Sequence, residues 1–505
     1  MAEDLVIGID CSTTASKAVA WDHEGNHVAE GRGSFEMLSP QSGWSEQRAD
    51  DWWEATSQSL RTVADEVGSE RIAGVCITHQ RETFVPVDAG DRPLRNGIMW
   101  DDERSREQVS ELDRRFGGDE LHRLTGRPLA LAQSVTKLLW LVEHESDTAE
   151  SAHKFLDVSA FLLRHLVGEY VSGIGSADST GLIDMQRHAW AEDLIRDIGL
   201  RPEQFPAIVE PGERLGEVTE RGAKATGLRV GTPVYAGVGD GQAACLGAGV
   251  TSLDRSYFNL GTAVTGGPVS REYVTDRSCR TLYGGIPDTF VLESVLRGGI
   301  ATIAWFMEHF SEADHADDYD HYEAEAGKLP EGSGGLMLVP YWNNVMSPYW
   351  DTRASGLVAG WHAEHGPAHL YRAIMEGITF EHRLVQSGIA EASGQRIDEH
   401  VILGGGSNSD LWCQMAADIL GARVTRARSA EATNLGAGVL AAYGAGWFDS
   451  VEDAARAMTA TTEHFDPHEP ARERYDRLFD EVYRHLFPPI QERLDRLTEL
   501  RTEFQ

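Results

Sequence analysis

The first half of the chain alternates short apolar runs with segments of helical periodicity. Residues 5–21 are apolar at both ends and small and polar in the middle, which predicts two buried strands around a short loop. Apolar residues at helical spacing over 50–67 predict a helix, and residues 135–143 predict another. Residues 72–78 and 84–87 have the apolar, β-branched character of strands. This mixture favours an α/β fold.

A second unit of the same kind begins near Gly231. Residues 232–249 predict a strand that runs into a helix of small residues. Residues 256–268 then predict a strand, a Gly-Thr turn and a second strand. Because this last segment has the same shape as residues 5–21, the sequence predicts an internally duplicated α/β architecture.

The length of the chain also predicts two domains. At 505 residues it exceeds what one hydrophobic core usually serves. We expect a first domain of residues 1–248 and a second of residues 249–505. The tail after His464 is charged and helical in pattern, and is expected to pack on the second domain.

The composition adds a large excess of acid. The chain carries 80 acidic and 45 basic residues, a formal net charge of −35, and only five of the basic residues are lysine. Because the acids are dispersed, they indicate a surface that stays hydrated in high salt, as in a halophilic cytoplasm. Such a field opposes binding to nucleic acid and anionic membranes. The chain has no run of about 18 apolar residues and no basic leader, so a cytoplasmic protein is expected.

Three loops have the small, polar composition that suits a phosphate group. The first runs from Asp10 to Lys17, where hydroxyls and backbone amides could face an anion and Asp10 could hold Mg²⁺. The second is the Gly-Thr turn at 261–262, and the third is the Gly-rich turn at 404–409, which leads into an amphipathic helix. Each alone could be only a tight turn. Together they favour a nucleotide held between two domains.

Two longer segments connect these loops to a known family. Residues 134–144, with Lys137 and Trp140, follow the first signature of the FGGY carbohydrate kinases. Residues 356–376 resemble the second signature, with Trp361 at a position that is usually aliphatic. Loops and signatures occur in the family's order over nearly the whole chain. The resemblance implies two actin-like (ribonuclease H-like) ATPase domains, with ATP and Mg²⁺ in the interdomain cleft and the acceptor at its base.

The resemblance also implies roles for single residues. Asp240, in a strand-to-helix segment of small residues, matches the catalytic aspartate that takes a proton from the acceptor hydroxyl, although the position by itself favours a helix cap. Asp10 and Asp240 would hold Mg²⁺. Ser12 stands where the family usually has glycine. The residues expected to bind ATP are Asp10, Thr13, Thr14, Lys17, Gly261, Thr262, Gly404, Gly405 and Ser409.

The segments expected to bind the acceptor point to two kinds of sugar kinase. Gln80, Arg81 and Glu82 resemble the glycerol-kinase form, in which the Arg and Glu side chains bind vicinal hydroxyls. An Arg–Glu pair with only a structural role is the alternative. Trp100 and Asp102 instead resemble the Trp-x-Asp-x-Arg motif of the pentulose kinases.

Two small residues argue against glycerol. Ala132 stands where glycerol kinases have an aromatic residue over the acceptor, and Gly241 stands where a glutamine is frequent. Two lost side chains predict a roomier pocket and so a five-carbon acceptor. That acceptor would be a pentulose such as xylulose or ribulose, or a phosphorylated pentose such as ribose 1-phosphate, whose phosphate Arg81, Arg104 or His79 could meet. Glycerol is the alternative.

A protein of another class must also be weighed. Actin-like folds also serve regulators that bind ATP or a sugar without kinase activity. Residues 80–83 and the Asp240 motif favour a kinase. The expected partners are therefore a small sugar or polyol and ATP, without nucleic acid or membrane. Members of the family are often dimers or tetramers, so a homodimer is an expectation from the resemblance alone.

Overall fold

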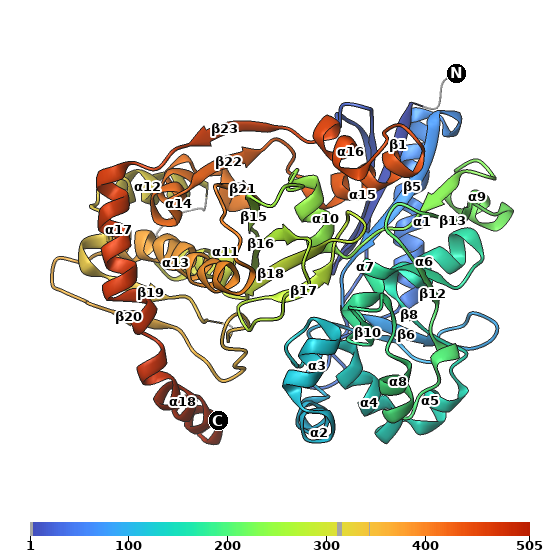
Figure 1. Cartoon of the computed structure of the whole chain (residues 1–505), viewed down its shortest axis with the longest axis horizontal. Coiled ribbons are helices and arrows are strands. Elements are labelled where there is room, and N and C mark those ends of the chain that lie inside the picture. Colours follow the sequence, from blue (N-terminus) through green and yellow to red (C-terminus); the bar gives the residue numbers. More distant parts are fainter. Residues whose placement is uncertain (1–3, 311–315, 343, 505) are drawn as a thin grey trace.

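Each half of the chain builds a sheet around the hairpin that its sequence pattern predicts. The structure, a computed structural model, describes residues 4–310, 316–342 and 344–504. In the first half, β1 (Leu5–Cys11) and β2 (Ala15–Trp21) pair antiparallel. In the second half, β15 (Arg255–Leu260) and β16 (Val264–Ser270) pair in the same way. Figure 1 shows the two halves side by side.

Six strands of each sheet follow the same order when one of the two orders is read backwards, and the second sheet adds β17 at one edge. The first has the order β13-β14-β5-β1-β2-β3, and the second has the order β17-β18-β16-β15-β21-β22-β23. In each, an antiparallel meander of three strands is followed by two parallel strands, since β1, β5 and β14 are parallel, as are β15, β21 and β22. The other strands are β3 (His27–Ser34), β5 (Ile72–His79), β13 (Arg214–Glu217), β14 (Pro233–Tyr235), β17 (Arg280–Tyr283), β18 (Phe290–Leu296), β21 (Glu399–Leu403), β22 (Arg423–Ala427) and β23 (Thr461–Phe465). The predicted duplicated α/β architecture is confirmed.

Amphipathic helices cover the two sheets. On the first sheet, α1 (Ala49–Val67) buries Trp52 and Leu60 in the core formed with β1 and β5. On the second sheet, α13 (Pro367–Ser393) and α14 (Asp410–Leu420) supply much of the core. In the tail, α17 (Glu469–Glu481) places Tyr475 and Phe479 in the same core, so the tail packs on the second half as predicted.

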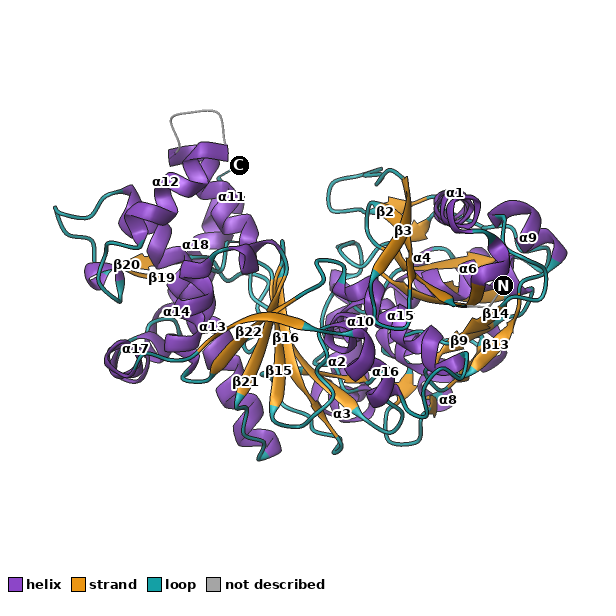
Figure 2. Cartoon of the chain, turned by 90° about the horizontal axis from the view of Figure 1, so that it is seen from above, coloured by secondary structure: helices purple, strands orange, loops and turns teal. Residues whose placement is uncertain are grey.

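Two helices of the second half lie on the first sheet. Leu435 and Val439 of α15 (Ala432–Gly444) and Val451 of α16 (Val451–Met458) share a core with Val6 and Trp21. Helix α15 also packs on α10 (Asp240–Gly247), so that both helices lie between the two sheets (Figure 2). The boundary between residues 248 and 249 stays a prediction, and the chain crosses back over it at α15.

A smaller sheet in the first half carries further predicted segments. It has the order β4-β7-β6-β8, formed by β4 (Glu46–Gln47), β6 (Phe84–Val87), β7 (Gly97–Ile98) and β8 (Lys154–Asp157). Helix α4 (Ser134–His144) packs beside it and contains the predicted helix 135–143. In the part of the chain that the structure describes, no helix is both long and apolar enough to span a bilayer.

The parallel strands bring the predicted site segments together. Strands β1 and β5 end at Cys11 and His79, and a bridge from His79 to Gly239 holds the start of α10 beside them. In the second sheet, β15 and β21 end together just before the loops at 261–262 and 404–409. Ligands of parallel α/β sheets bind outside the carboxyl ends of the strands. The site is therefore expected between these two edges.

Candidate active site

A cleft of about 560 Å³ lies at this position, and both halves of the chain form its wall. The residues from the first half include Thr13, Gln80, Arg81, Glu82, Trp100, Asp101, Asp102, Ala132 and Asp240. Those from the second half include Thr262, Thr265, Arg280, Val295, Arg297, Ala301, Asn344 and Met346. The cleft therefore unites the predicted catalytic, acceptor and phosphate segments.

Asp240 stands at the first turn of α10. The residue at the N-cap is Gly239, so Asp240 is the first helical residue and not the cap. Its Oδ1 accepts a hydrogen bond of 2.7 Å from the amide of Gly241 and lies 2.6 Å from Nε of Arg81. Oδ2 has no hydrogen-bond partner among the described residues, and the side chain is 41% exposed. A carboxylate so held presents one free oxygen to the cleft.

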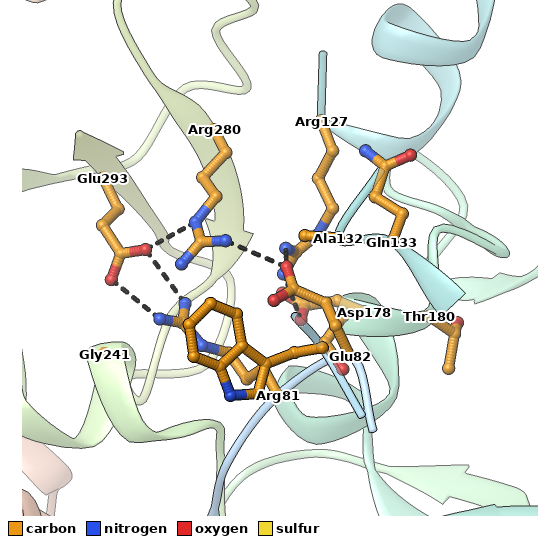
Figure 3. Close-up of polar contacts among 12 residues, drawn as sticks. Arg81, Glu82, Arg127, Ala132, Gln133, Asp178, Thr180, Gly241, Arg280 and Glu293 are labelled. Atoms are coloured by element: carbon orange, nitrogen blue, oxygen red, sulfur yellow. Dashed lines mark hydrogen bonds and ion pairs between the residues drawn. The ribbon is translucent and has the colours of Figure 1, made fainter. Parts of the chain in front are cut away.

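Arg81 and Glu82 are joined to charges of the second half (Figure 3). The guanidinium of Arg81 contacts both oxygens of Glu293, at 3.0 and 3.3 Å. Nη1 of Arg280 donates to Glu82 at 2.9 Å, and Nε of Arg280 donates to Glu293 at 2.6 Å. The hydroxyl of Tyr257 donates to the same glutamate at 2.7 Å. These contacts form a buried circuit that connects the acceptor segment to β17 and β18.

The circuit extends further into the first half. Arg127 donates to Glu82 at 2.7 Å and to Asp178 at 3.0 Å. All these side chains are almost fully buried, and the arginines beside Glu293 lower the pKa of that carboxyl to about 2 against the effect of burial. Glu82 has a φ of 62°, which is unusual for a residue with a side chain, and the surrounding ion pairs hold it there.

The space beside Gly241 is filled, which corrects the interpretation of a roomier pocket at that position. A Cβ added to Gly241 would lie 1.9 Å from Oε1 of Glu293 and 2.8 Å from Nη2 of Arg81. The glycine therefore makes room for the circuit and not for a larger acceptor. Ala132 does line the cleft, so the argument from that residue stands.

Trp100 and Asp102 occupy different places in the site. Trp100 lines the cleft, and its Nε1 donates to Oγ1 of Thr13 at 3.4 Å. Both oxygens of Asp102 are engaged, by the amide of Ser45 and by the guanidinium of Arg104. Asp102 thus holds the loop in place, and the neighbouring Asp101 is the residue whose Oδ1 is buried without a hydrogen-bond partner. The sequence pattern gave no reason to choose Asp101.

Arg104 and His79 cannot meet a phosphate as the sequence suggested. The side chain of Arg104 is fully buried, with its guanidinium over the ring of Trp44 and paired with Asp102 and Glu46. His79 is buried at the end of β5, and its Nδ1 is 2.7 Å from the carbonyl of Gln80. Neither lines the cleft.

Lys137 fixes the wall of the cleft from behind. It is fully buried in α4, and Nζ donates to the carbonyl of Ala132 at 2.5 Å and to that of Trp100 at 3.2 Å. Burial lowers the pKa of this amine to about 8, against the attraction of Glu82. The signature lysine thus positions two wall residues.

The first of the predicted phosphate loops contains one carboxylate without a hydrogen bond. Oδ1 of Asp10 is buried and unpartnered, and burial, followed by the charges of Asp240 and Glu431, raises its pKa to about 7. Thr13 lines the cleft and Thr14 is exposed next to it. Lys17 lies opposite Asp10 on β2, and its Nζ is 2.6 Å from Oε1 of Glu431.

The other two loops adjoin one another at the end of β15, and of their predicted residues Gly261, Gly404, Gly405 and Ser409 do not line the cleft. Thr262 lines the cleft, and the carbonyl of Gly261 accepts from the amide of Ile300 in α11 (Gly299–Phe310) at 3.1 Å. Gly404, with φ of 83°, packs on the end of β15, and the Cα of Gly405 faces open space. The hydroxyl of Ser409 caps α14 and donates to Glu323 at 2.6 Å.

Several site residues carry no sequence signal. Arg280 and Arg297 line the cleft although they belong to no motif that the sequence reveals. Arg127, Asp178 and Glu293 also lie outside any motif, and they do not line the cleft but join the buried circuit with Arg81, Glu82 and Arg280. No local sequence motif could have indicated these residues, because their partners lie in other segments of the chain.

Comparisons with known proteins identify the family of the chain. The sequence matches the FGGY family of carbohydrate kinases, with the N-terminal domain over residues 5–247 and the C-terminal domain over residues 256–445. The chain belongs to this family and is a sugar kinase. Its two sheets with their shared order of strands are the two actin-like ATPase domains that the resemblance implied.

Individual relatives cover almost the whole chain. The xylulose kinase of Bacillus subtilis is 29% identical over 489 residues, which are 95% of this chain and 96% of that protein. The glycerol kinase of Thermococcus gammatolerans is 30% identical over 461 residues, 89% of this chain and 91% of that protein. The crystal structure of xylulose kinase from Rhodospirillum rubrum superposes with a TM-score of 0.90 at 25% identity, covering 97% of this chain and 99% of that chain.

Proposed function

We propose that this sugar kinase transfers the γ-phosphoryl group of ATP to a primary hydroxyl of a pentulose, of the xylulose or ribulose type. The observation that carries the proposal is the gathering in one cleft of Asp240, two phosphate loops and unpartnered acceptors. Oε1 of Gln80 and Oδ1 of Asp101 are buried without hydrogen bonds, and both residues line the cleft. Sugar hydroxyls are donors that would satisfy them.

Asp240 is the base in this proposal. The acceptor oxygen attacks the γ-phosphorus, the bond from phosphorus to the bridging oxygen of ADP breaks, and the hydroxyl proton passes to the free Oδ2 of Asp240. Arg81 holds the other oxygen at 2.6 Å, which fixes the direction of the carboxylate. Arg81 and Glu82 would bind acceptor hydroxyls through those guanidinium N–H groups and carboxylate oxygens that the circuit does not use.

The residues at the first loop fit a divalent cation. The buried, unpartnered Oδ1 of Asp10 has its charged form opposed by burial and by Asp240, and a cation would offset both. No cluster of three or more His, Cys, Asp or Glu side chains suited to a metal occurs in the described segments, but Mg²⁺ is usually held by one or two carboxylates together with substrate phosphates. Asp10 and Asp240 would hold it, and the bound ion would neutralise charge on the transferring phosphoryl group.

In this proposal the three loops contact different parts of the nucleotide. Thr13, Thr14 and Lys17 with Gly261 and Thr262 would surround the β- and γ-phosphates. Gly404, Gly405 and Ser409 would lie along the adenosine, where the open space beside Gly405 leaves room for it. The contact of Gly404 with the end of β15 joins the second and third loops into one surface.

The size of the acceptor rests on Ala132 and on the relatives. The alanine leaves the wall beside Trp100 without an aromatic cover, in a cleft of about 560 Å³. Xylulose kinases are among the relatives that align over 95% of the chain. Glycerol is the second candidate, because the segment from Gln80 to Glu82 has the glycerol-kinase form and a glycerol kinase is 30% identical.

An acceptor panel tests the proposal. Release of ADP would be followed in molar KCl with Mg-ATP and glycerol, xylulose, ribulose, ribose or ribose 1-phosphate. We expect saturable turnover with xylulose or ribulose, and a loss in kcat of at least about a hundredfold in Asp240→Asn with the same acceptor. Saturable turnover with glycerol alone would assign the second candidate. A much smaller loss in Asp240→Asn would remove Asp240 as the base.

A further inference from the structure

Arg297 follows the last residue of β18 and lies beside the second phosphate loop. Strand β18 pairs with β16 in a register that sets Leu296 opposite Val264, so Arg297 is one residue beyond the pair, towards the loop at 261–263. Two residues later the chain is still close to this loop, because a Cβ on Gly299 would lie 3.1 Å from the carbonyl oxygen of Gly261. The side chain of Arg297 lines the cleft.

The same arginine is also connected to the first phosphate loop. Its Cζ lies 5.8 Å from the centroid of the Trp100 ring. The indole nitrogen of Trp100 in turn donates to Oγ1 of Thr13. Arg297 is therefore placed between the two loops that the proposed function assigns to the β- and γ-phosphates.

Arg297 differs from the other cations near the cleft in having no anionic partner. Among the side chains that the structure describes, no carboxylate forms an ion pair or hydrogen bond with it. Arg81 and Arg280 are tied to Glu293, and Lys17 is tied to Glu431. In a chain with 80 acidic residues, a half-buried arginine in the site has been left with its donors unused.

The weak contact with Trp100 does not account for this arrangement. A cation over an aromatic ring at such a distance is only weakly attracted at a partly exposed site. A guanidinium offers five N–H donors in a planar fork that matches two oxygens of a phosphate group. The position between two phosphate loops gives those donors a ligand of the right charge and geometry.

We propose that Arg297 binds phosphate oxygens in the cleft and so supplies positive charge for phosphoryl transfer in addition to that of Lys17, which is paired with Glu431. The inference rests on the proposed kinase function. The phosphate has two sources with the same chemistry. It is the γ-phosphoryl group of ATP, or a phosphate that the acceptor already carries, as in a pentose phosphate.

Direct binding separates this inference from the choice of acceptor. Titration calorimetry at one fixed concentration of KCl would measure the affinity of the whole chain for Mg-ATP, for ribose 1-phosphate and for neutral xylulose. Arg297→Met removes the charge and keeps the length, whereas Arg297→Lys keeps the charge without the fork. Arg396→Met is the control, because Arg396 is 89% exposed and pairs with Asp398 away from the cleft.

The expected result is a loss of about tenfold or more in affinity for a phosphate ligand in Arg297→Met, with partial recovery in Arg297→Lys. A loss for Mg-ATP identifies the donor phosphate, and kcat should then fall by about a hundredfold or more with every acceptor. A loss for ribose 1-phosphate alone identifies the acceptor phosphate. Unchanged affinity for both, or an equal loss for xylulose, overturns the inference. If no acceptor of the panel is turned over, the proposed function fails while the Mg-ATP titration still decides the role of Arg297.

Discussion

Asp10 shows how a site residue can oppose the stability of the protein that contains it. Its Oδ1 is buried without a hydrogen bond, and its pKa is raised to about 7 by burial and by the nearby charges of Asp240 and Glu431. A group with a pKa raised above the unfolded value of 3.8 binds its proton more tightly in the folded state. Its contribution to stability therefore falls as the pH rises from about 4 to about 7 and remains unfavourable above that range.

Asp10→Asn should consequently melt at a higher temperature than the parent at pH 8 without nucleotide. A rise of about 3 °C or more is expected, and the difference should shrink as the pH falls from 7 towards 4, because Asp10 then becomes protonated in the folded state. Phosphoryl transfer should fall by about a hundredfold or more, because the variant loses a carboxylate that we propose holds the cation. Melting curves and ADP release would be compared with Asp65→Asn, an exposed site on α1. A lower melting temperature at pH 8 would contradict this view of Asp10.

At the scale of elements, β17 and β18 carry charge from the second half into the acceptor segment. Arg280 and Glu293 are direct partners in the register of these antiparallel strands. From there Glu293 holds Arg81 and Arg280 holds Glu82, so one cross-strand pair orients two successive residues of the first half. The start of α10 can approach this pair only because residue 241 is glycine.

Gly241→Ala tests this arrangement. The new Cβ would meet Oε1 of Glu293 at 1.9 Å and displace the carboxylate from Arg81. The KM for the acceptor should rise by about tenfold or more, with a much smaller change in the KM for ATP. Gly366→Ala is the matched control, because a Cβ there meets nothing within 4 Å. Equal KM values for the acceptor in Gly241→Ala and the parent would show that the circuit does not orient Arg81.

At the scale of the whole molecule, repulsion and attraction act over different distances. With a formal net charge of −35, the acidic side chains repel one another across the whole surface. By contrast, the halves are joined at short range by Arg81 with Glu293, by Arg280 with Glu82 and by Lys17 with Glu431. Salt screens exposed charges strongly, with a Debye length of about 3 Å at 1 M, and screens buried pairs much less.

The melting temperature and kcat should therefore both rise between 0.1 and about 2 M KCl. The physical reason is that salt removes the surface repulsion and leaves most of the buried interdomain attraction. Scanning fluorimetry and ADP release would be measured over this range, with sucrose as a non-ionic control for crowding. A melting temperature that stays constant or falls with KCl would contradict the interpretation of the acidic surface as an adaptation to high salt.

The sequence by itself determined the features that depend on residues close together along the chain. Alternating apolar runs defined the two hairpins and helical spacing defined α1 and α4, whereas Asp240 was chosen from the family resemblance, since its position alone favoured a helix cap. These features could be predicted because strands, helices and turns follow from neighbours a few residues apart. The order of loops and signatures was sufficient to identify the family.

Only the tertiary structure decided which charges meet. Lys17 pairs with Glu431, 414 positions away in the sequence, and Arg81 pairs with Glu293, 212 positions away. The lysine predicted to bind phosphate is therefore paired, whereas Arg297, which the sequence analysis did not select, has no carboxylate partner among the described side chains. The same contacts filled the space beside Gly241 that the sequence had left open. Such pairings depend on where two sheets and their edges come together, and no local pattern carries that information.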